Sequence, residues 1–203
     1  MNDTHETKDN LRYWFNQASE EQMTEGLRWY KDANDYVEHL HQELDCFFPR
    51  VQIAGVISAL SPRNKWERNK IDAENVLLAV KNSPNKTVSE LMERVKVCTF
   101  NANKIKAFNI AKGNYSIIEK SPKTYAFSRN VGLLDSDYVT IDSWHIRACN
   151  TKSHEPVKAK TQVSPKQYDE ISEITKEIAE EMGLKAYEFQ AVVWVTIRDY
   201  WTQ

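Results

Sequence analysis

The chain has 203 residues, and its 27 basic and 29 acidic residues give a formal net charge of −2. This length suits one compact domain or two small lobes, and the balanced charge means that any nucleic-acid-binding surface must be local. The three cysteines are odd in number and far apart, which fits neither a disulfide framework nor a CxxC metal site and favours a reducing cytoplasm. The polar N-terminus predicts no signal peptide, and no apolar run reaches the roughly 18 residues of a membrane span.

Helical periodicity extends over nearly the whole chain, interrupted by only 5 glycines and 6 prolines. The predicted helices are, in chain order, 9–48 with a break near residues 18 and 19, 50–60, 66–81, one capped at residue 87, 101–112, one beginning near 122, 143–149, 166–182 and 185–201. The only strand candidate is "DYVTID", which is too short to build a sheet. The fold class is therefore predicted to be all-α, with a helical region over 1–48 and a second over 49–203 in a single compact unit overall.

Local sequence signals predict where several helices begin and end. Thr87 and Glu90 have the spacing of a capping box, and Ser121-Pro122 combines an N-cap residue with a proline at the first helical position. Gly113 and Gly183 follow apolar helical stripes and are expected to end them. The segment 150–165 is polar and is predicted to be the longest loop, with lysines at Lys152, Lys158 and Lys160.

Asp142 is the most informative carboxylate. It lies within "VTIDSW", residues 139–144, whose β-branched and aromatic neighbours predict burial. A buried carboxylate is costly unless it is paired or hydrogen-bonded. Because Asp142 precedes a predicted helix, it could accept backbone N–H groups as an N-cap and gain from the helix dipole. Lys123 likewise has a simple explanation, as a solvated lysine in a first helical turn.

The spacing of these two residues and the segments around them resemble those of the helix-hairpin-helix superfamily of DNA glycosylases. This superfamily includes endonuclease III-like and 8-oxoguanine glycosylase-like enzymes. Lys123 lies 19 residues before Asp142, and the segments "SPKTYAF" and "TIDSWHIRA" are similar to the lysine and aspartate segments of that family. The segments "GVISALSPRNKWERNKIDAENVL", "FNANKIKAFNIAKG" and "RNVG" resemble further parts of it. The resemblance covers about residues 51–199, and small phage-encoded relatives share this compact pattern.

The resemblance implies an all-α fold of two helical lobes with a central cleft. It implies a DNA N-glycosylase with AP lyase activity, in which Lys123 and Asp142 are catalytic. Asp142 would stabilise the positive charge that develops on the sugar, and Lys123 would attack C1′ as a neutral amine. A helix N-terminus disfavours a cation, and burial would act in the same direction. The four-cysteine loop of some members is absent, so we expect no iron–sulfur cluster and no other cofactor or metal.

The expected partner is duplex DNA with a flipped base, whose gap a protein side chain must fill. Arg63 and Asn64 occupy the turn where the family inserts such a side chain, although a polar turn explains them equally well. The candidates for contact with DNA or the flipped nucleotide are Arg63, Asn64, Lys65, Trp66, Ser121, Ser143, Trp144 and His145. For the two tryptophans, core packing is the simpler explanation. His145, one turn after Asp142, is expected to hydrogen-bond the carboxylate.

Two positions depart from the family pattern, because Glu119 and Ser121 stand where the hairpin has glycines. Glutamate tolerates a positive φ poorly and repels a phosphate. Two alternatives therefore stay open: a base-modifying enzyme acting on hypermodified phage DNA, and a non-catalytic DNA- or protein-binding module on the same scaffold. For a phage-encoded protein the expected location is the host cytoplasm.

Overall fold

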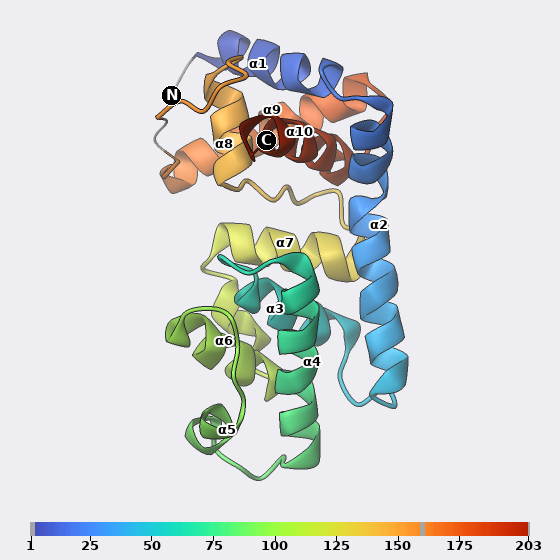
Figure 1. Ribbon diagram of the computed structural model, residues 1–203, viewed down its shortest axis with the longest axis vertical. Helices are drawn as coiled ribbons and strands as arrows, with labels where there is room; N and C mark the ends of the chain where they lie inside the picture. The colour runs from blue at the N-terminus through green and yellow to red at the C-terminus, as the bar shows by residue number, and fades with distance from the viewer. Residues whose placement is uncertain (1–2, 159–160, 203) are drawn as a thin grey trace. The chain divides into compact units, whose positions relative to one another are not determined.

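The computed structural model describes residues 3–158 and 161–202, and over these residues the chain forms α-helices, one 3₁₀ helix and no strand (Figure 1). The elements are α1 (Thr4–Asn16), α2 (Glu20–Glu43), α3 (Arg50–Leu60), α4 (Trp66–Asn82), α5 (Val88–Arg94), α6 (Asn101–Ala111), η1 (Tyr115–Ile118), α7 (Pro122–Leu133), α8 (Ser143–Asn150), α9 (Pro165–Glu181) and α10 (Ala186–Thr202). The all-α class is confirmed. The strand candidate at 137–142 has no regular structure, and Lys160 lies outside the described residues.

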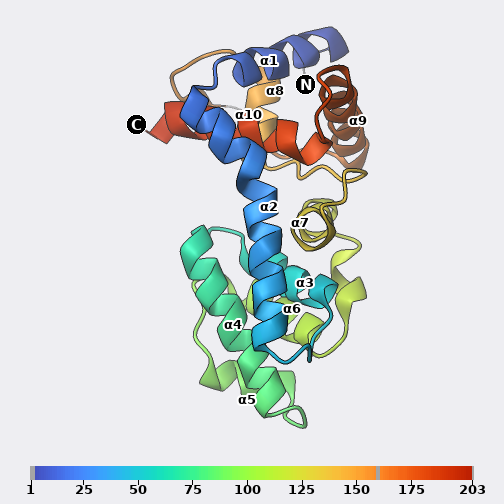
Figure 2. The same cartoon turned by 90° about the vertical axis from the view of Figure 1, so that its right-hand side faces the viewer.

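The helices pack into two compact units. Unit 1 contains the described parts of Met1–Asp32 and Leu134–Gln203, and unit 2 is Ala33–Leu133. Helix α2 contributes to both, as Figure 2 shows. The boundaries of these units differ from the predicted division into 1–48 and 49–203. The reason is that α1 packs on α8, α9 and α10 rather than forming a region of its own with α2.

Most helix boundaries follow the local signals. Thr87 forms a complete capping box with Glu90, as predicted. The break near residue 18 is also confirmed, since α1 ends at Asn16 and α2 begins at Glu20. Helix α2 ends five residues before the predicted position 48, because Asp45 and Cys46 adopt left-handed φ values of 54° and 55°. Such backbone ends a right-handed helix.

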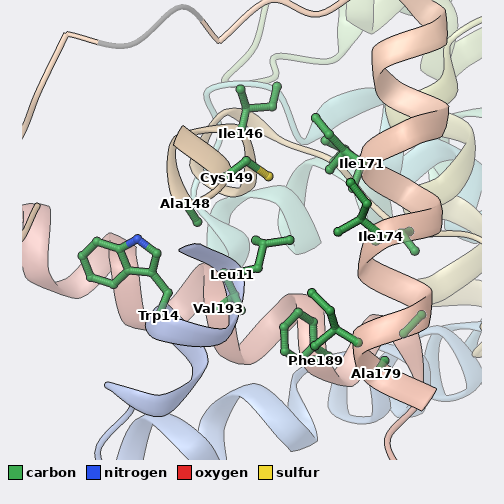
Figure 3. Packing of buried hydrophobic residues seen from close by; sticks show 14 of the residues in the cluster. Leu11, Trp14, Ile146, Ala148, Cys149, Ile171, Ile174, Ala179, Phe189 and Val193 are labelled. Atoms are coloured by element: carbon green, nitrogen blue, oxygen red, sulfur yellow. The ribbon is translucent and has the colours of Figure 1, made fainter. Parts of the chain in front are cut away.

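The core of unit 1 joins helices from both ends of the chain (Figure 3). Its most deeply buried residues include Leu11 and Trp14 of α1, Cys149 of α8, Ile171 of α9, and Phe189 and Val193 of α10. Cys149 behaves as a small apolar residue there, and burial raises the pKa of its thiol. A thiol that stays protonated is a poor nucleophile, so Cys149 is a packing residue.

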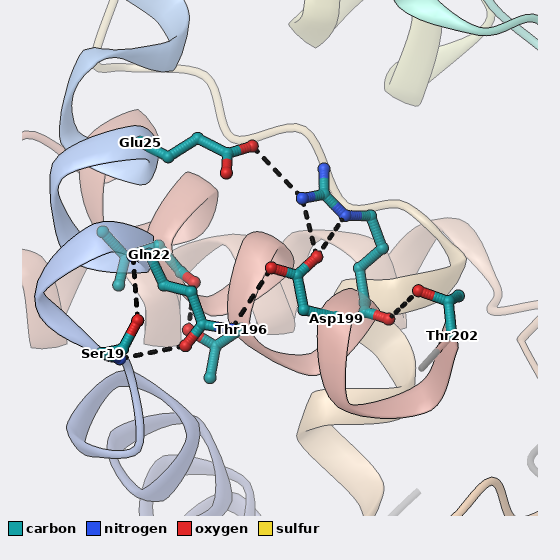
Figure 4. Close-up of polar contacts among 8 residues, drawn as sticks. Ser19, Gln22, Glu25, Thr196, Asp199 and Thr202 are labelled. Carbon is teal, nitrogen blue, oxygen red and sulfur yellow. Dashed lines mark hydrogen bonds and ion pairs between the residues drawn. The ribbon is translucent and has the colours of Figure 1, made fainter.

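Helices α2 and α10 approach each other closely in unit 1. Gly26 is buried, and a Cβ atom built on it would lie only 2.5 Å from the Cα of Val192. Glu25, the residue before Gly26, binds Arg198 at 3.2 Å, and Arg198 also binds Asp199 at 2.8 Å, as Figure 4 shows. The absence of a side chain at Gly26 thus permits the crossing, and this ion-pair network flanks it.

Unit 2 is built around α3, which is buried from Ile53 to Leu60, as its apolar sequence predicts. Gly132 of α7 faces Ala54, because a Cβ atom on this glycine would lie 2.8 Å from the alanine Cβ. The Gln52 amide donates to the carbonyls of Ile110 and Ala111, at 2.8 Å each. It thereby adds a side-chain donor to two carbonyls at the end of α6, where the regular helical hydrogen bonds stop.

Candidate functional site

Asp142 caps the N-terminus of α8. Its backbone is extended, with φ −98° and ψ −178°, and its Oδ1 accepts the backbone N–H groups of Trp144 and His145, both at 2.9 Å. The predicted N-cap role is thus confirmed, and the side chain is half-buried. Charge-assisted hydrogen bonds and the helix dipole both favour the ionised carboxylate at this position.

Tyr168 of α9 binds the segment that leads to Asp142. The Tyr168 hydroxyl donates to the carbonyl of Val139 at 2.8 Å and accepts the N–H of Ile141 at 3.2 Å. Burial raises the pKa of Tyr168 to about 12, with a smaller contribution in the same direction from the charge of Asp142. Tyr168 was not among the predicted site residues, although a tyrosine in the first turn of an amphipathic helix was an available signal.

The imidazole of His145 does not contact Asp142, and the predicted ring–carboxylate hydrogen bond is wrong. Only the backbone N–H of His145 reaches the carboxylate. The ring is fully buried, and its Nε2 lies 3.0 Å from the hydroxyl oxygen of Thr175. Because that hydroxyl donates to the carbonyl of Ile171 at 2.8 Å, Nε2–H must be the donor toward Thr175. Burial lowers the pKa of His145 to about 3, so the ring is neutral.

The ring of Trp144 is engaged by its own unit. It meets Trp201 edge-on at 6.1 Å, and the guanidinium of Arg147 lies 4.6 Å from its centroid. The ring is half-buried and packs against the core of unit 1. These contacts favour the core-packing explanation of Trp144. Ser143, also half-buried, is the first residue of α8.

Lys123 is the second residue of α7 and is exposed. The expectation that burial would help to activate its amine is therefore wrong for the unbound chain. Before it, Ser121 donates its backbone N–H to the carbonyl of Ile118 at 2.8 Å, and its own carbonyl accepts the N–H of Tyr125. Both bonds fasten the turn that joins η1 to α7.

The turn before Lys123 does not use the backbone of a glycine hairpin. Glu119 has φ −57° and ψ −31°, which is ordinary right-handed geometry, so the strain anticipated for a glutamate at this position does not arise. The helix before the turn is reduced to η1, a single 3₁₀ turn.

The predicted site residues divide between the units. Ser143, Trp144 and His145 lie with Asp142 in unit 1. The unit 2 candidates are Arg63, Asn64, Lys65, Trp66, Ser121 and Lys123. That Lys123 and Asp142 face a common cleft stays a prediction.

Arg63 forms the tip of the turn between α3 and α4. It has a left-handed φ of 57°, a conformation that is uncommon for residues other than glycine. Its guanidinium lies 5.3 Å from the ring centroid of Phe100, which is 54% exposed. The turn therefore presents an exposed cation beside an exposed aromatic ring, and Phe100 was not among the predicted site residues.

The buried side chain of Asp72 holds this turn in place through hydrogen bonds. The carboxylate is fully buried and accepts hydrogen bonds from the Asn64 amide at 3.0 Å, Arg68 Nε at 2.8 Å and the backbone N–H of Cys98 at 2.7 Å. Of the two residues expected to insert into DNA, Asn64 is thus turned inward as an anchor, and Arg63 alone projects. A carboxylate beside the apolar stripe of helix 66–81 was the signal for Asp72 in the sequence.

Trp66 packs within unit 2. Its half-buried ring meets Tyr36 of α2 at 6.1 Å, and the ammonium of Lys70 lies 5.9 Å from its centroid. Lys65, by contrast, is exposed at the N-cap position of α4 and forms no side-chain cap bond. Exposed basic residues of this region include Arg63 and Lys65 on the turn, Arg68 in the first turn of α4, and Arg94 and Lys96 before Cys98.

Two further features concern ligands and membranes. Among residues 3–158 and 161–202, no group of three or more histidine, cysteine, aspartate or glutamate side chains is arranged to hold a metal ion. No helix in this part of the chain combines the length and apolarity that crossing a membrane requires.

Residues 2–200 match a protein family model described as "Family of unknown function (DUF7178)". Comparisons with curated proteins and with solved structures give no match.

Proposed function

The chain belongs to the DUF7178 family, whose description assigns no activity, and we propose that it is a DNA glycosylase that releases a damaged or modified base. The observation that carries the proposal is the Asp142 carboxylate, fixed by two backbone N–H groups at 2.9 Å. An exposed lysine at the start of a helix, 19 residues earlier, accompanies it. The proposed fold is that of a two-lobed helix-hairpin-helix glycosylase, with both residues at the central cleft.

Asp142 supplies the electrostatic part of the proposed reaction. Breaking an N-glycosidic bond builds positive charge on the sugar. A carboxylate already held in place stabilises that charge without reorganising during the reaction, and removing such a group costs roughly 10²-fold or more in rate. Its N-cap bonds keep it ionised.

Lys123 supplies the nucleophile. Its neutral amine attacks C1′, the bond from C1′ to the base breaks, and the base leaves with a proton. The nitrogen lone pair then expels O4′, which takes up a proton, and a protonated Schiff base joins Lys123 to C1′. Loss of a proton from C2′ permits elimination of the 3′ phosphate, and water then hydrolyses the Schiff base and releases the lysine. The exposure of Lys123 supports this role, because a nucleotide can reach the amine.

The DNA surface is proposed to include the turn of Arg63 and Lys65 together with Phe100. An exposed cation over an exposed ring can both approach phosphates and stack against an unpaired base. Arg63 is the proposed wedge, since Asn64 is committed to Asp72. The loop lysines Lys152 and Lys158 are exposed and would add phosphate contacts. The reaction is proposed for the cytoplasm and needs no cofactor.

One observation favours a second candidate. Glu119 and the single 3₁₀ turn of η1 replace the glycine hairpin that grips a phosphate in glycosylases of this type. A weakened grip fits a base-modifying enzyme on hypermodified phage DNA, or a non-catalytic DNA- or protein-binding module. If Glu119 is the residue that weakens the phosphate contact, Glu119→Gly should tighten duplex binding.

The test is a panel of duplexes that carry damaged or hypermodified bases, followed by chromatography for free base. Release of a base by the parent protein, and its loss in Asp142→Asn, would support the glycosylase. A changed base that stays attached to its sugar would support the base-modifying enzyme. Binding without any chemical change would support the non-catalytic module.

A further inference from the structure

The segment before Asp142 is buried, yet it belongs to no helix or sheet. Val139, Thr140 and Ile141 are all at most 5% exposed, and residues 138–142 have no regular secondary structure. Main-chain N–H and C=O groups in such a segment need hydrogen-bond partners from elsewhere in the chain. In a helical protein these partners cannot come from a neighbouring strand.

Tyr168 of α9 supplies two of these partners with one hydroxyl group. It donates to the carbonyl of Val139 at 2.8 Å and accepts the N–H of Ile141 at 3.2 Å. The hydroxyl thus bridges two main-chain groups on either side of Thr140, as a paired strand would. The second of these groups belongs to the residue immediately before Asp142.

Tyr30 of α2 fixes the intervening residue. Its hydroxyl donates to Oε1 of Gln190 at 2.9 Å and also shares a hydrogen bond with the side chain of Thr140. Burial raises the pKa of Tyr30 well above its usual value, and the charge of Asp142 adds to the increase. Both tyrosines therefore stay neutral at ordinary pH and keep the proton that they donate. Both also lie close enough to the Asp142 carboxylate for its charge to raise their pKa.

We propose that Tyr168 and Tyr30 are positioning residues for the Asp142 carboxylate. They hold residues 139–141 through hydrogen bonds from Tyr168 of α9 and from Tyr30 of α2, which is itself bound to Gln190 of α10. This holds Asp142 in the extended conformation that lets its Oδ1 accept both N–H groups of α8. The consequence for base release rests on the proposed glycosylase function, whereas the consequence for the cap geometry does not.

The variant Tyr168→Phe separates positioning from packing, because it keeps the ring in the core and removes only the hydroxyl. Tyr30→Phe is the second variant, in case the first folds poorly. The matched control is Tyr13→Phe, which removes a tyrosine hydroxyl in the same unit that lies 2.6 Å from Nε2 of His154 instead. All three variants lose one oxygen atom and no charge.

The first measurement is amide hydrogen exchange by NMR at Trp144 and His145, whose N–H groups are bound by Asp142 Oδ1. Losing a neutral hydrogen bond that holds the cap should speed this exchange by about tenfold in Tyr168→Phe. Tyr13→Phe should leave it unchanged. Unchanged exchange in both Tyr168→Phe and Tyr30→Phe would overturn the proposal, whether or not the protein releases a base.

The second measurement couples the tyrosine to the carboxylate in an active protein. Tyr168→Phe should slow base release by about tenfold in the parent but add no further loss to Asp142→Asn, because residues that act as a unit are not additive. Losses that simply multiply would mean that Tyr168 does not act through Asp142 and would reject the proposal. If the parent releases no base, the glycosylase function fails and the exchange measurement alone decides the positioning role.

Discussion

Asp142 and His145 are joined through the main chain and not through their side chains. Oδ1 of Asp142 accepts the His145 backbone N–H at 2.9 Å, while the imidazole turns into the core toward Thr175. The Asp142 carboxylate is therefore hydrogen-bonded to the N-terminus of α8 and not to the imidazole of His145.

Asp142→Asn should separate capping from catalysis. Asparagine caps helices about as well as aspartate, so the melting temperature should change little. The amide cannot supply the negative charge, so base release should slow by roughly 10²-fold. Single-turnover assays and thermal melting measure the two effects. Asp142→Ala is the contrasting variant, because it should also lose about 1 kcal/mol of stability with the cap. Full activity in a folded Asp142→Asn protein would show that Asp142 caps α8 and has no part in catalysis.

Lys123→Gln should abolish borohydride trapping of the protein on abasic DNA, because no Schiff base can form without the amine. Duplex binding, measured by anisotropy, should stay nearly intact. Lys120→Gln is the matched control, since Lys120 is an exposed lysine just before the same helix and its loss removes the same charge. Equal trapping by the two variants would exclude Lys123 as the nucleophile.

Arg63→Gln should weaken duplex binding and reduce its salt dependence. Each phosphate contact contributes about −0.9 to the log–log slope of affinity against salt, so the slope should become shallower by about that amount if Arg63 contacts one phosphate. Arg28→Gln removes an exposed arginine of α2 and should leave the slope unchanged. A parent affinity that does not respond to salt would point to a protein partner.

His145 should make the protein less stable as the pH falls. Burial holds its folded pKa near 3, whereas in the unfolded chain it is about 6.5. Between these values the unfolded state binds more protons, so the free energy of unfolding falls as the pH drops below about 6.5. One such group removes about 2 kcal/mol by pH 5.

Urea unfolding at pH 7.5 and pH 5 measures this effect. His145→Gln should flatten the difference, because its amide can still donate to Thr175 but does not titrate. His39→Gln, at an exposed position of α2, should preserve the parent's slope. An equal slope in His145→Gln would assign the acid sensitivity to other groups.

Gly26→Ala should destabilise unit 1. The added Cβ would lie 2.5 Å from the Cα and 2.7 Å from the backbone nitrogen of Val192, so relief requires α2 and α10 to move apart. Overpacking of this kind costs about 1–3 kcal/mol, which outweighs the roughly 1 kcal/mol by which alanine exceeds glycine in helix propensity. Thr24→Ala, at an exposed site of α2, should change stability by less than about 0.5 kcal/mol. Denaturant unfolding compares the two variants.

The sequence by itself determined the all-α class, most helix boundaries and the N-cap role of Asp142. These features depend on groups within four residues of one another, such as Thr87 with Glu90 or Asp142 with the N–H of His145. Local hydrogen bonds and the helical period each require residues at fixed spacings, so the sequence alone reveals them. The left-handed pair that ends α2 was missed because neither Asp45 nor Cys46 is a glycine.

Only the tertiary structure decided which distant residues surround the site. Tyr168 reaches Val139 across 29 positions, and Asp72 reaches the N–H of Cys98 across 26. The direction of the His145 ring was likewise set by Thr175, 30 residues away. A single sequence carries no spacing rule for such contacts, because the packing of whole helices fixes them and many alternative partners have the same chemistry. The caps were therefore predictable, whereas the partners that Tyr168 and Asp72 bind were not, although sequence position hinted at each residue itself.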